Sequence, residues 1–215
     1  MCKGIGMVQS FDMKIAILGG AFDPIHIGHY LVAQQVKEQL QMDEVWLMVC
    51  YSYFPEFPDK LQHITSYEER FKMATLFASG KAIVSDFEEK YNKRSRTIDT
   101  LRLLKMHYPQ DTFYWIIGSD ALPTFHLWNQ WEEMIRDNNI IVFPRDTDLK
   151  TLKQRVYDSF QLSKIPDNIT VLEGDLIVST ISSTHIRDRV AKQLPIEHFV
   201  SQEVKEYIEK KGLYK

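Results

Sequence analysis

Short runs rich in β-branched and aromatic residues alternate with longer stretches of helical periodicity along almost the whole chain. Strands are expected at 14–18, 44–49, 82–85, 112–117, 139–143 and 169–172. Helices are expected at 30–42, 67–79, 97–107, 131–136, 149–160, 184–192 and 201–211. This alternation predicts βαβ units with right-handed crossovers, and hence an α/β fold with a doubly wound parallel sheet and helices on both faces. Ligands bind beyond the carboxyl ends of such strands, so the loops that follow strands are the candidate sites.

Composition narrows the class of protein. With 44% hydrophobic and 26% charged residues, the 215-residue chain can bury a sizeable core, and its net charge of −3 does not indicate a general nucleic-acid binder. Two cysteines cannot build a disulfide framework or a four-cysteine zinc site. No apolar run approaches the roughly 18 residues of a membrane span, so we expect no membrane partner and a cytoplasmic location. Because Met13 directly precedes the first strand, we expect an extension at 1–12 and one domain at 13–215.

The loop after the first strand carries the strongest functional pattern. It reads Gly-Gly-Ala-Phe-Asp-Pro-Ile-His-Ile-Gly-His over 19–29 and joins a buried strand to a helix. Its glycines permit a tight turn and a close approach of a ligand to the backbone. The helix start offers unpaired N–H groups, and His26 and His29 share one face of it. Gly28, which lies between them in the sequence, leaves the space above the helix open. These features predict an anion site suited to phosphate.

Two plainer interpretations of this loop stay open. One is a glycine turn with two ordinary surface histidines, which is common for a bare His-x-x-His pair. The other is a zinc site, which requires a third and a fourth ligand. The chain has no His-Glu-x-x-His motif and no cysteine pair nearby, so zinc is disfavoured.

A second candidate phosphate element lies near the C-terminus. Residues 180–187 read Thr-Ile-Ser-Ser-Thr-His-Ile-Arg, and they follow a strand and open a helix. Small hydroxyl residues at a helix start either cap the N–H groups or leave them for a phosphate, and Arg187 lies one turn further on. The alternative is a plain serine N-cap with Arg187 on a solvated face.

Both motifs resemble the nucleotidylyltransferase superfamily. His-Ile-Gly-His matches its (H/T)-x-G-H phosphate motif, and the wider stretch at 19–29 is very similar to bacterial nicotinate-mononucleotide adenylyltransferases. Ile-Ser-Ser-Thr-x-Ile-Arg is the second signature of these enzymes, and the similarity runs from about Met13 to Tyr214. The resemblance implies a Rossmann-like fold and transfer of the adenylyl group of ATP to nicotinate mononucleotide. The products would be nicotinate adenine dinucleotide (deamido-NAD) and pyrophosphate, formed in NAD biosynthesis, with Mg²⁺ carried by the ATP phosphates.

The same resemblance implies the roles of individual residues. Expected catalytic groups are His26, His29, Lys60 and Arg187, with His29 nearest the transferred group. Expected ATP contacts are Gly20, Ala21, Phe22, His26, Gly28, His29, Gly118, Asp120, Ile181, Ser183, Thr184 and Arg187. Expected mononucleotide contacts are Asp23, Arg96, Thr97 and Trp128.

Three of these residues have equally ordinary structural alternatives. Asp120, at the carboxyl end of a strand, could accept from a ribose hydroxyl or could be a helix N-cap. Trp128 could stack on the pyridine ring or belong to the core. Thr97 is also a credible N-cap, and Arg96 stands where tyrosine is common in the family.

The chain departs from the family in the loop expected at 51–66. Phe57-Pro58-Asp59-Lys60 stands in place of the usual Pro-Pro-His-Lys, and the loop is unusually aromatic. Lys60 still supplies a positive charge there. The departure leaves two alternatives open: a nicotinamide-mononucleotide enzyme or another nucleotidylyltransferase of the same fold, and a non-catalytic nucleotide-binding protein. Whether the chain forms a homo-oligomer also stays open.

Overall fold

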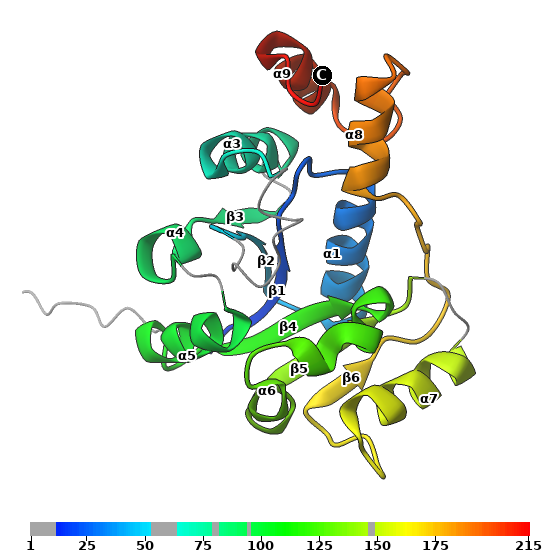
Figure 1. Cartoon of the computed structure of the whole chain (residues 1–215). Helices are drawn as coiled ribbons and strands as arrows, with labels where there is room; N and C mark the ends of the chain where they lie inside the picture. The colour runs from blue at the N-terminus through cyan, green and yellow to red at the C-terminus, as the bar shows by residue number, and fades with distance from the viewer. Residues whose placement is uncertain (1–11, 53–63, 79–81, 94–95, 146–148) are drawn as a thin grey trace, which may run out of the picture.

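Six parallel strands form the centre of the computed structural model, which describes residues 12–52, 64–78, 82–93, 96–145 and 149–215 (Figure 1). The strands are β1 (Lys14–Gly20), β2 (Glu44–Val49), β3 (Ile83–Ser85), β4 (Thr112–Gly118), β5 (Asn139–Phe143) and β6 (Ile169–Val171). They lie in the order β3-β2-β1-β4-β5-β6, and every neighbouring pair is parallel. This order confirms the predicted Rossmann-like sheet, and the strand order reverses between β1 and β4.

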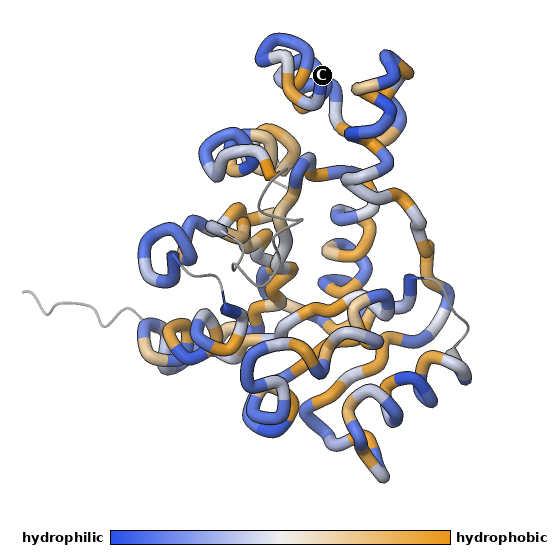
Figure 2. Tube along the Cα trace, in the orientation of Figure 1, coloured by the Kyte–Doolittle hydropathy of each residue, from blue (hydrophilic) through white to orange (hydrophobic). Residues whose placement is uncertain are grey.

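Helices cover both faces of this sheet. They are α1 (Ile27–Leu40), α3 (Tyr67–Ala78), α4 (Phe87–Tyr91), α5 (Thr97–His107), α6 (Trp131–Asp137), α7 (Leu149–Phe160), α8 (Ser183–Ala191) and α9 (Gln202–Lys211), with a 3₁₀ helix η1 (Ser119–Leu127). One core cluster packs α1, α3, α8 and α9 on strand residues such as Ala16 and Leu18. The other packs α4, α5, α6, α7 and η1 on the alternate residues, such as Ile15 and Ile17. Each central strand is therefore buried on both faces, which explains its continuous apolar run (Figure 2).

The structure differs from the sequence-based expectation in a few elements. Helix α1 begins at Ile27 rather than at 30, because His26 is already its N-cap. Helix α4 and η1 were not predicted; the former has only five residues and the latter contains Pro123, so neither shows a clear helical periodicity. The C-cap at Gly212 is confirmed, with a left-handed φ of 64°. None of the described helices is long and apolar enough to cross a membrane.

Gly19, next to the end of β1, is required by its neighbour on β4. A Cβ atom at this position would lie 2.4 Å from Cζ2 of the buried Trp115 indole and 2.9 Å from its Cη2. We expect Gly19→Ala to lower the free energy of unfolding by about 1–3 kcal/mol, because the rigid ring must shift in a packed core. Urea unfolding measures this loss. In a Trp115→Leu background the cost of Gly19→Ala should shrink, and an equal cost in both backgrounds would contradict the contact.

Candidate functional site

The two sequence motifs meet at the carboxyl edge of the sheet. Helix α8 lies beside the N-terminal end of α1 (Figure 1). The Ser183 hydroxyl donates to the Pro24 carbonyl oxygen at 2.9 Å, and Nη1 of Arg187 donates to the Asp23 carbonyl oxygen at 2.7 Å. These contacts join segments about 160 residues apart (|i−j| of 159 and 164), so the front and the rear of the chain build one site.

The helix start of α8 is arranged so that its hydroxyls serve different purposes. Ser182 is the N-cap, and its side chain accepts from the backbone N–H of His185 at 3.2 Å. Ser183 and Thr184 are therefore not the cap. Thr184 instead accepts from Nη2 of Arg187 at 3.1 Å, which fixes the guanidinium beside the first loop. The alternative of a plain serine N-cap is therefore right for Ser182, but its placement of Arg187 on a solvated face is wrong, because Arg187 donates to the first loop.

His26 and His29 form a stacked pair at the start of α1. Their ring centroids lie 3.7 Å apart with an interplanar angle of 27°, and Phe22 meets the His29 ring edge-on at 4.9 Å. The backbone N–H of His26 donates to Nδ1 of His29 at 3.2 Å. Since Nδ1 accepts, the neutral His29 ring carries its proton on Nε2 and can donate it to an oxygen ligand.

Burial keeps both imidazoles neutral. Desolvation, followed by the positive charge of Arg145, lowers the pKa of His26 to about 3. Desolvation also lowers the pKa of His29 well below its ordinary value, with further contributions from His26 and Arg145. The site therefore presents neutral N–H donors rather than imidazolium charges.

Arg145 is the functional candidate that sequence reasoning missed. It follows β5 and connects three segments at the strand ends: its backbone N–H donates to the Ser119 hydroxyl at 2.9 Å, and Nη2 donates to the Ile181 carbonyl oxygen at 3.0 Å. Its Nη1 lies 3.9 Å from the Asp120 carboxylate. The available signal was its place just after a buried strand, which is where ligand groups lie in this kind of sheet.

The absence of a side chain at Gly28 leaves space for the His26 ring. A Cβ atom here would lie 3.0 Å from Nδ1 of His26 and 3.3 Å from the Ser179 hydroxyl. His26 is 1% exposed, and its Nδ1 has no hydrogen-bond partner among the described residues. An unpaired buried nitrogen is costly, so we expect a ligand or a water to pair with it.

The first loop is held in place by hydrogen bonds to its backbone carbonyl groups. The guanidinium of the fully buried Arg70 donates to the carbonyl oxygens of Ala21, Cys50, Tyr51 and Thr65 at 2.6–3.0 Å. The Gly20 carbonyl oxygen accepts from the Cys50 N–H at 2.9 Å. Arg70 thus ties the ends of the loops after β1 and β2 together, which sets the position of the phosphate motif.

The expected mononucleotide contacts occupy more varied places. Asp23 is 4% exposed, and both carboxylate oxygens have protein partners, Tyr214 and the Thr65 N–H. Trp128 is half-buried and lies 5.0 Å from the Phe125 ring, centroid to centroid, so it is neither an exposed nor a fully buried residue. Direct contact of either residue with a mononucleotide stays a prediction.

Two capping alternatives are wrong. Arg96 occupies the N-cap position of α5, so Thr97 is its first helical residue. Gly118 occupies the N-cap of η1, which leaves Asp120 exposed and facing Arg145. Arg96 is held through its carbonyl oxygen, which accepts from the Asn92 amide at 3.1 Å. Lys60 and Asp59 lie outside the described residues.

Among the residues that the structure describes, no three metal-ligating side chains gather. The site instead combines neutral imidazoles, hydroxyls and guanidinium groups around a helix N-terminus. A parallel sheet of this strand order, with such donors at its switch point, is the architecture of nucleotide-binding α/β proteins. The chain belongs to the cytidylyltransferase-like family, whose model matches residues 17–189.

Relatives and solved structures agree with this membership. "Probable nicotinate-nucleotide adenylyltransferase" of Exiguobacterium sibiricum is 35% identical over 94% of this chain and 99% of its own length. The protein of the same name from Opitutus terrae is 36% identical over 94% of this chain and 98% of its own length. The structure of Plasmodium falciparum nicotinic acid mononucleotide adenylyltransferase complexed with NaAD has a similar fold, with a TM-score of 0.73. It is 23% identical, and the match covers 94% of this chain and 97% of that one.

The lowered histidine pKa values predict how stability depends on pH. Below about pH 6.5 an unfolded histidine takes up a proton that the folded His26, with its pKa of about 3, does not. The unfolded state is therefore stabilised relative to the folded state as pH falls from 7 toward 3. Between pH 7 and pH 5 we expect the free energy of unfolding of the wild type to fall by about 2 kcal/mol more than that of His26→Asn.

Denaturant unfolding at both pH values measures this difference. His198→Asn is the matched control, because the side chain of His198 is exposed whereas that of His26 is buried. It should keep the wild-type pH dependence. An identical loss of stability in the wild type and His26→Asn would show that His26 titrates normally.

Proposed function

We propose that this chain is an adenylyltransferase that joins ATP and nicotinate mononucleotide to form nicotinate adenine dinucleotide and pyrophosphate in NAD biosynthesis. One observation carries the proposal: His26 and His29 from the front of the chain lie in the same site as Ser183 and Arg187 from its rear. The names of the relatives at about 35% identity over nearly their whole length support this substrate class.

The chemistry asks the protein for alignment and charge neutralisation. The 5′-phosphate of the mononucleotide attacks the α-phosphorus of ATP, a new P–O bond forms, and the bond to the departing pyrophosphate breaks. The nucleophile belongs to the substrate, so no covalent enzyme intermediate is needed. Phosphoryl-type transfers of this kind depend mainly on positioned donors and cations.

The site assigns these tasks to different groups. His29, with a proton on Nε2, donates to the transferred phosphate, and His26 lies against it in the stacked pair. Arg187, with Lys60, neutralises the β- and γ-phosphates, and the Ser183 and Thr184 hydroxyls lie beside them at the start of α8. Arg145 adds a fixed positive charge close to both imidazoles. Because the histidines are neutral, they donate hydrogen bonds without repelling these cations.

The remaining roles complete the proposal. The ATP side of the site is lined by Gly20, Ala21, Phe22, Gly28, Gly118, Asp120 and Ile181. Asp23, Arg96, Thr97 and Trp128 serve the mononucleotide side. ATP enters as its Mg²⁺ complex, with the cation held by phosphate oxygens and water. The reaction takes place in the cytoplasm, in a single domain at 13–215 that follows an extension at 1–12.

Pyrophosphate release with ATP and each pyridine mononucleotide tests the substrate. Release with nicotinate mononucleotide alone is expected. Release with nicotinamide mononucleotide instead would identify the sister activity of the same fold. Release with neither, under conditions where ATP still binds, would indicate a nucleotide-binding protein without this activity.

His29→Ala tests the assignment of the phosphate donor. We expect kcat to fall about 100-fold or more, because one preorganised donor to the transferred group is lost. Steady-state pyrophosphate release measures the loss, and His107→Ala, at an exposed position at the end of α5 and at the opposite edge of the sheet, should keep wild-type turnover. Near-normal turnover of His29→Ala would remove His29 from the mechanism.

A further inference from the structure

We propose that Tyr214, the penultimate residue, is a positioning residue of the nucleotide site. Its hydroxyl holds the Asp23 carboxylate, and through Asp23 it fixes the part of the first loop that meets Arg187. This inference rests on the proposed function and adds to it a group from the extreme C-terminus.

The contact itself is short, and its acceptor is buried. The Tyr214 hydroxyl donates to Oδ1 of Asp23 at 2.6 Å, and Asp23 is only 4% exposed. A hydroxyl that donates to a buried carboxylate is among the stronger hydrogen bonds in a protein. The Tyr214 hydroxyl also lies 3.9 Å from Sδ of Met73 on α3, so the end of the chain is enclosed between α3 and the first loop.

Asp23 connects Tyr214 to the residues of the site through further hydrogen bonds. Its second carboxylate oxygen accepts from the Thr65 N–H at 3.2 Å, and its carbonyl oxygen accepts from Arg187 at 2.7 Å. The following residue, Pro24, accepts from the Ser183 hydroxyl. One residue therefore connects the C-terminal tail, the segment before α3 and the start of α8. Loss of the Tyr214 donor leaves a buried carboxylate short of one partner, and a shift of Asp23 moves the carbonyl on which Arg187 rests.

The backbone of Tyr214 is consistent with a residue held by its contacts. Its φ of 64° lies in the left-handed region, which bulky side chains rarely adopt. Such a conformation persists where the surroundings fix it. Burial and the nearby Asp23 carboxylate raise the pKa of Tyr214 above its ordinary value, so the hydroxyl keeps its proton throughout the working range of pH.

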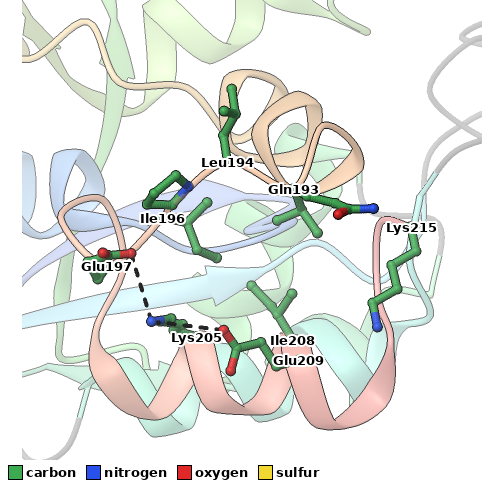
Figure 3. Close-up of a pocket in the computed structure, with 10 residues that line it drawn as sticks. Gln193, Leu194, Ile196, Glu197, Lys205, Ile208, Glu209 and Lys215 are labelled. Atoms are coloured by element: carbon green, nitrogen blue, oxygen red, sulfur yellow. Dashed lines mark ion pairs between the residues drawn. The ribbon is translucent and has the colours of Figure 1, made fainter.

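Helix α9 is anchored to the molecule without help from this hydroxyl. Val204 and Ile208 are buried, and the Tyr207 hydroxyl donates to Glu69 on α3 at 2.5 Å. On another side of α9, Figure 3 shows Lys205 between Glu197 and Glu209. Its Nζ lies 3.8 Å from the Glu197 carboxylate and 3.9 Å from the Glu209 carboxylate. Lys205 and Lys215 both line a cavity of about 350 Å³. The Tyr214 hydroxyl, by contrast, is directed at Asp23 in the first loop.

Two matched variants test the proposal. Tyr214→Phe removes the hydroxyl that reaches Asp23, and Tyr207→Phe makes the same chemical change in the contact between α9 and α3. We expect Tyr214→Phe to weaken ATP binding and kcat/KM for ATP by about 10-fold or more, which is the range for one charge-assisted hydrogen bond. Tyr207→Phe should keep both within about two-fold, since in the proposal its hydroxyl serves only the fold.

The readouts separate positioning from stability. Calorimetric titration with ATP measures affinity, pyrophosphate release measures kcat/KM, and thermal unfolding measures the fold. The proposal would be overturned if Tyr214→Phe lost ATP affinity only to the extent that its Tm fell. It would also be overturned if Tyr214→Phe and Tyr207→Phe lost the same ATP affinity. Tyr214→His keeps a ring donor and serves as the second variant, and an affinity between those of Tyr214→Phe and the wild type is expected.

The titration also keeps two failures apart. If the wild type binds ATP but releases no pyrophosphate with either mononucleotide, the proposed function fails while the ATP comparison still tests Tyr214. If release occurs and Tyr214→Phe matches the wild type in affinity and in kcat/KM, the positioning role fails and the proposed function stands.

Discussion

Backbone carbonyl groups of the first loop are the points on which the site is assembled. Ala21 accepts from Arg70, Asp23 from Arg187 and Pro24 from Ser183, and the three donors come from α3 and α8. A loop between a strand and a helix has no ladder or helical partner for these oxygens, so side chains must supply the hydrogen bonds. Because the donors belong to distant segments, satisfying the loop also brings the phosphate-binding groups together.

The electrostatic design separates donors from charges. The histidines are buried deeply enough to stay neutral, whereas Arg145 and Arg187 are held by carbonyl oxygens and a threonine hydroxyl at the rim. A guanidinium keeps its charge under these conditions, but an imidazole does not. In the proposed function, the polyphosphate meets fixed positive charge together with uncharged N–H donors, and the neutral imidazoles add no further positive charge beside the two guanidinium groups.

The sequence predicted the parts of the site that depend on local pattern. The strand–loop–helix context of His26 and His29 and the serine-rich start of α8 can be read from spacing, as can the parallel sheet that brings their ends together. The contacts of Arg145, Arg70 and Tyr214 could not be found in this way, because they include partners 36, 49 and 191 residues away. For Arg145 only its place after a buried strand gave a signal. Thr97 and Asp120 show the converse limit: both suit an N-cap by type, and backbone geometry gave the position to a neighbour.

The position of Asp23 shows why an acidic residue is compatible with a site for a polyphosphate. A carboxylate facing the phosphates would repel them, and burial would make that repulsion stronger. Here the carboxylate is turned toward Tyr214 and the Thr65 N–H, while the residue offers its carbonyl oxygen to Arg187. The hydroxyl and the amide N–H stabilise the negative charge. The same residue therefore holds a cation through its carbonyl oxygen and keeps its own charge engaged within the protein. In the proposed positioning role, Tyr214 from the segment after α9 takes part in the electrostatics of the site.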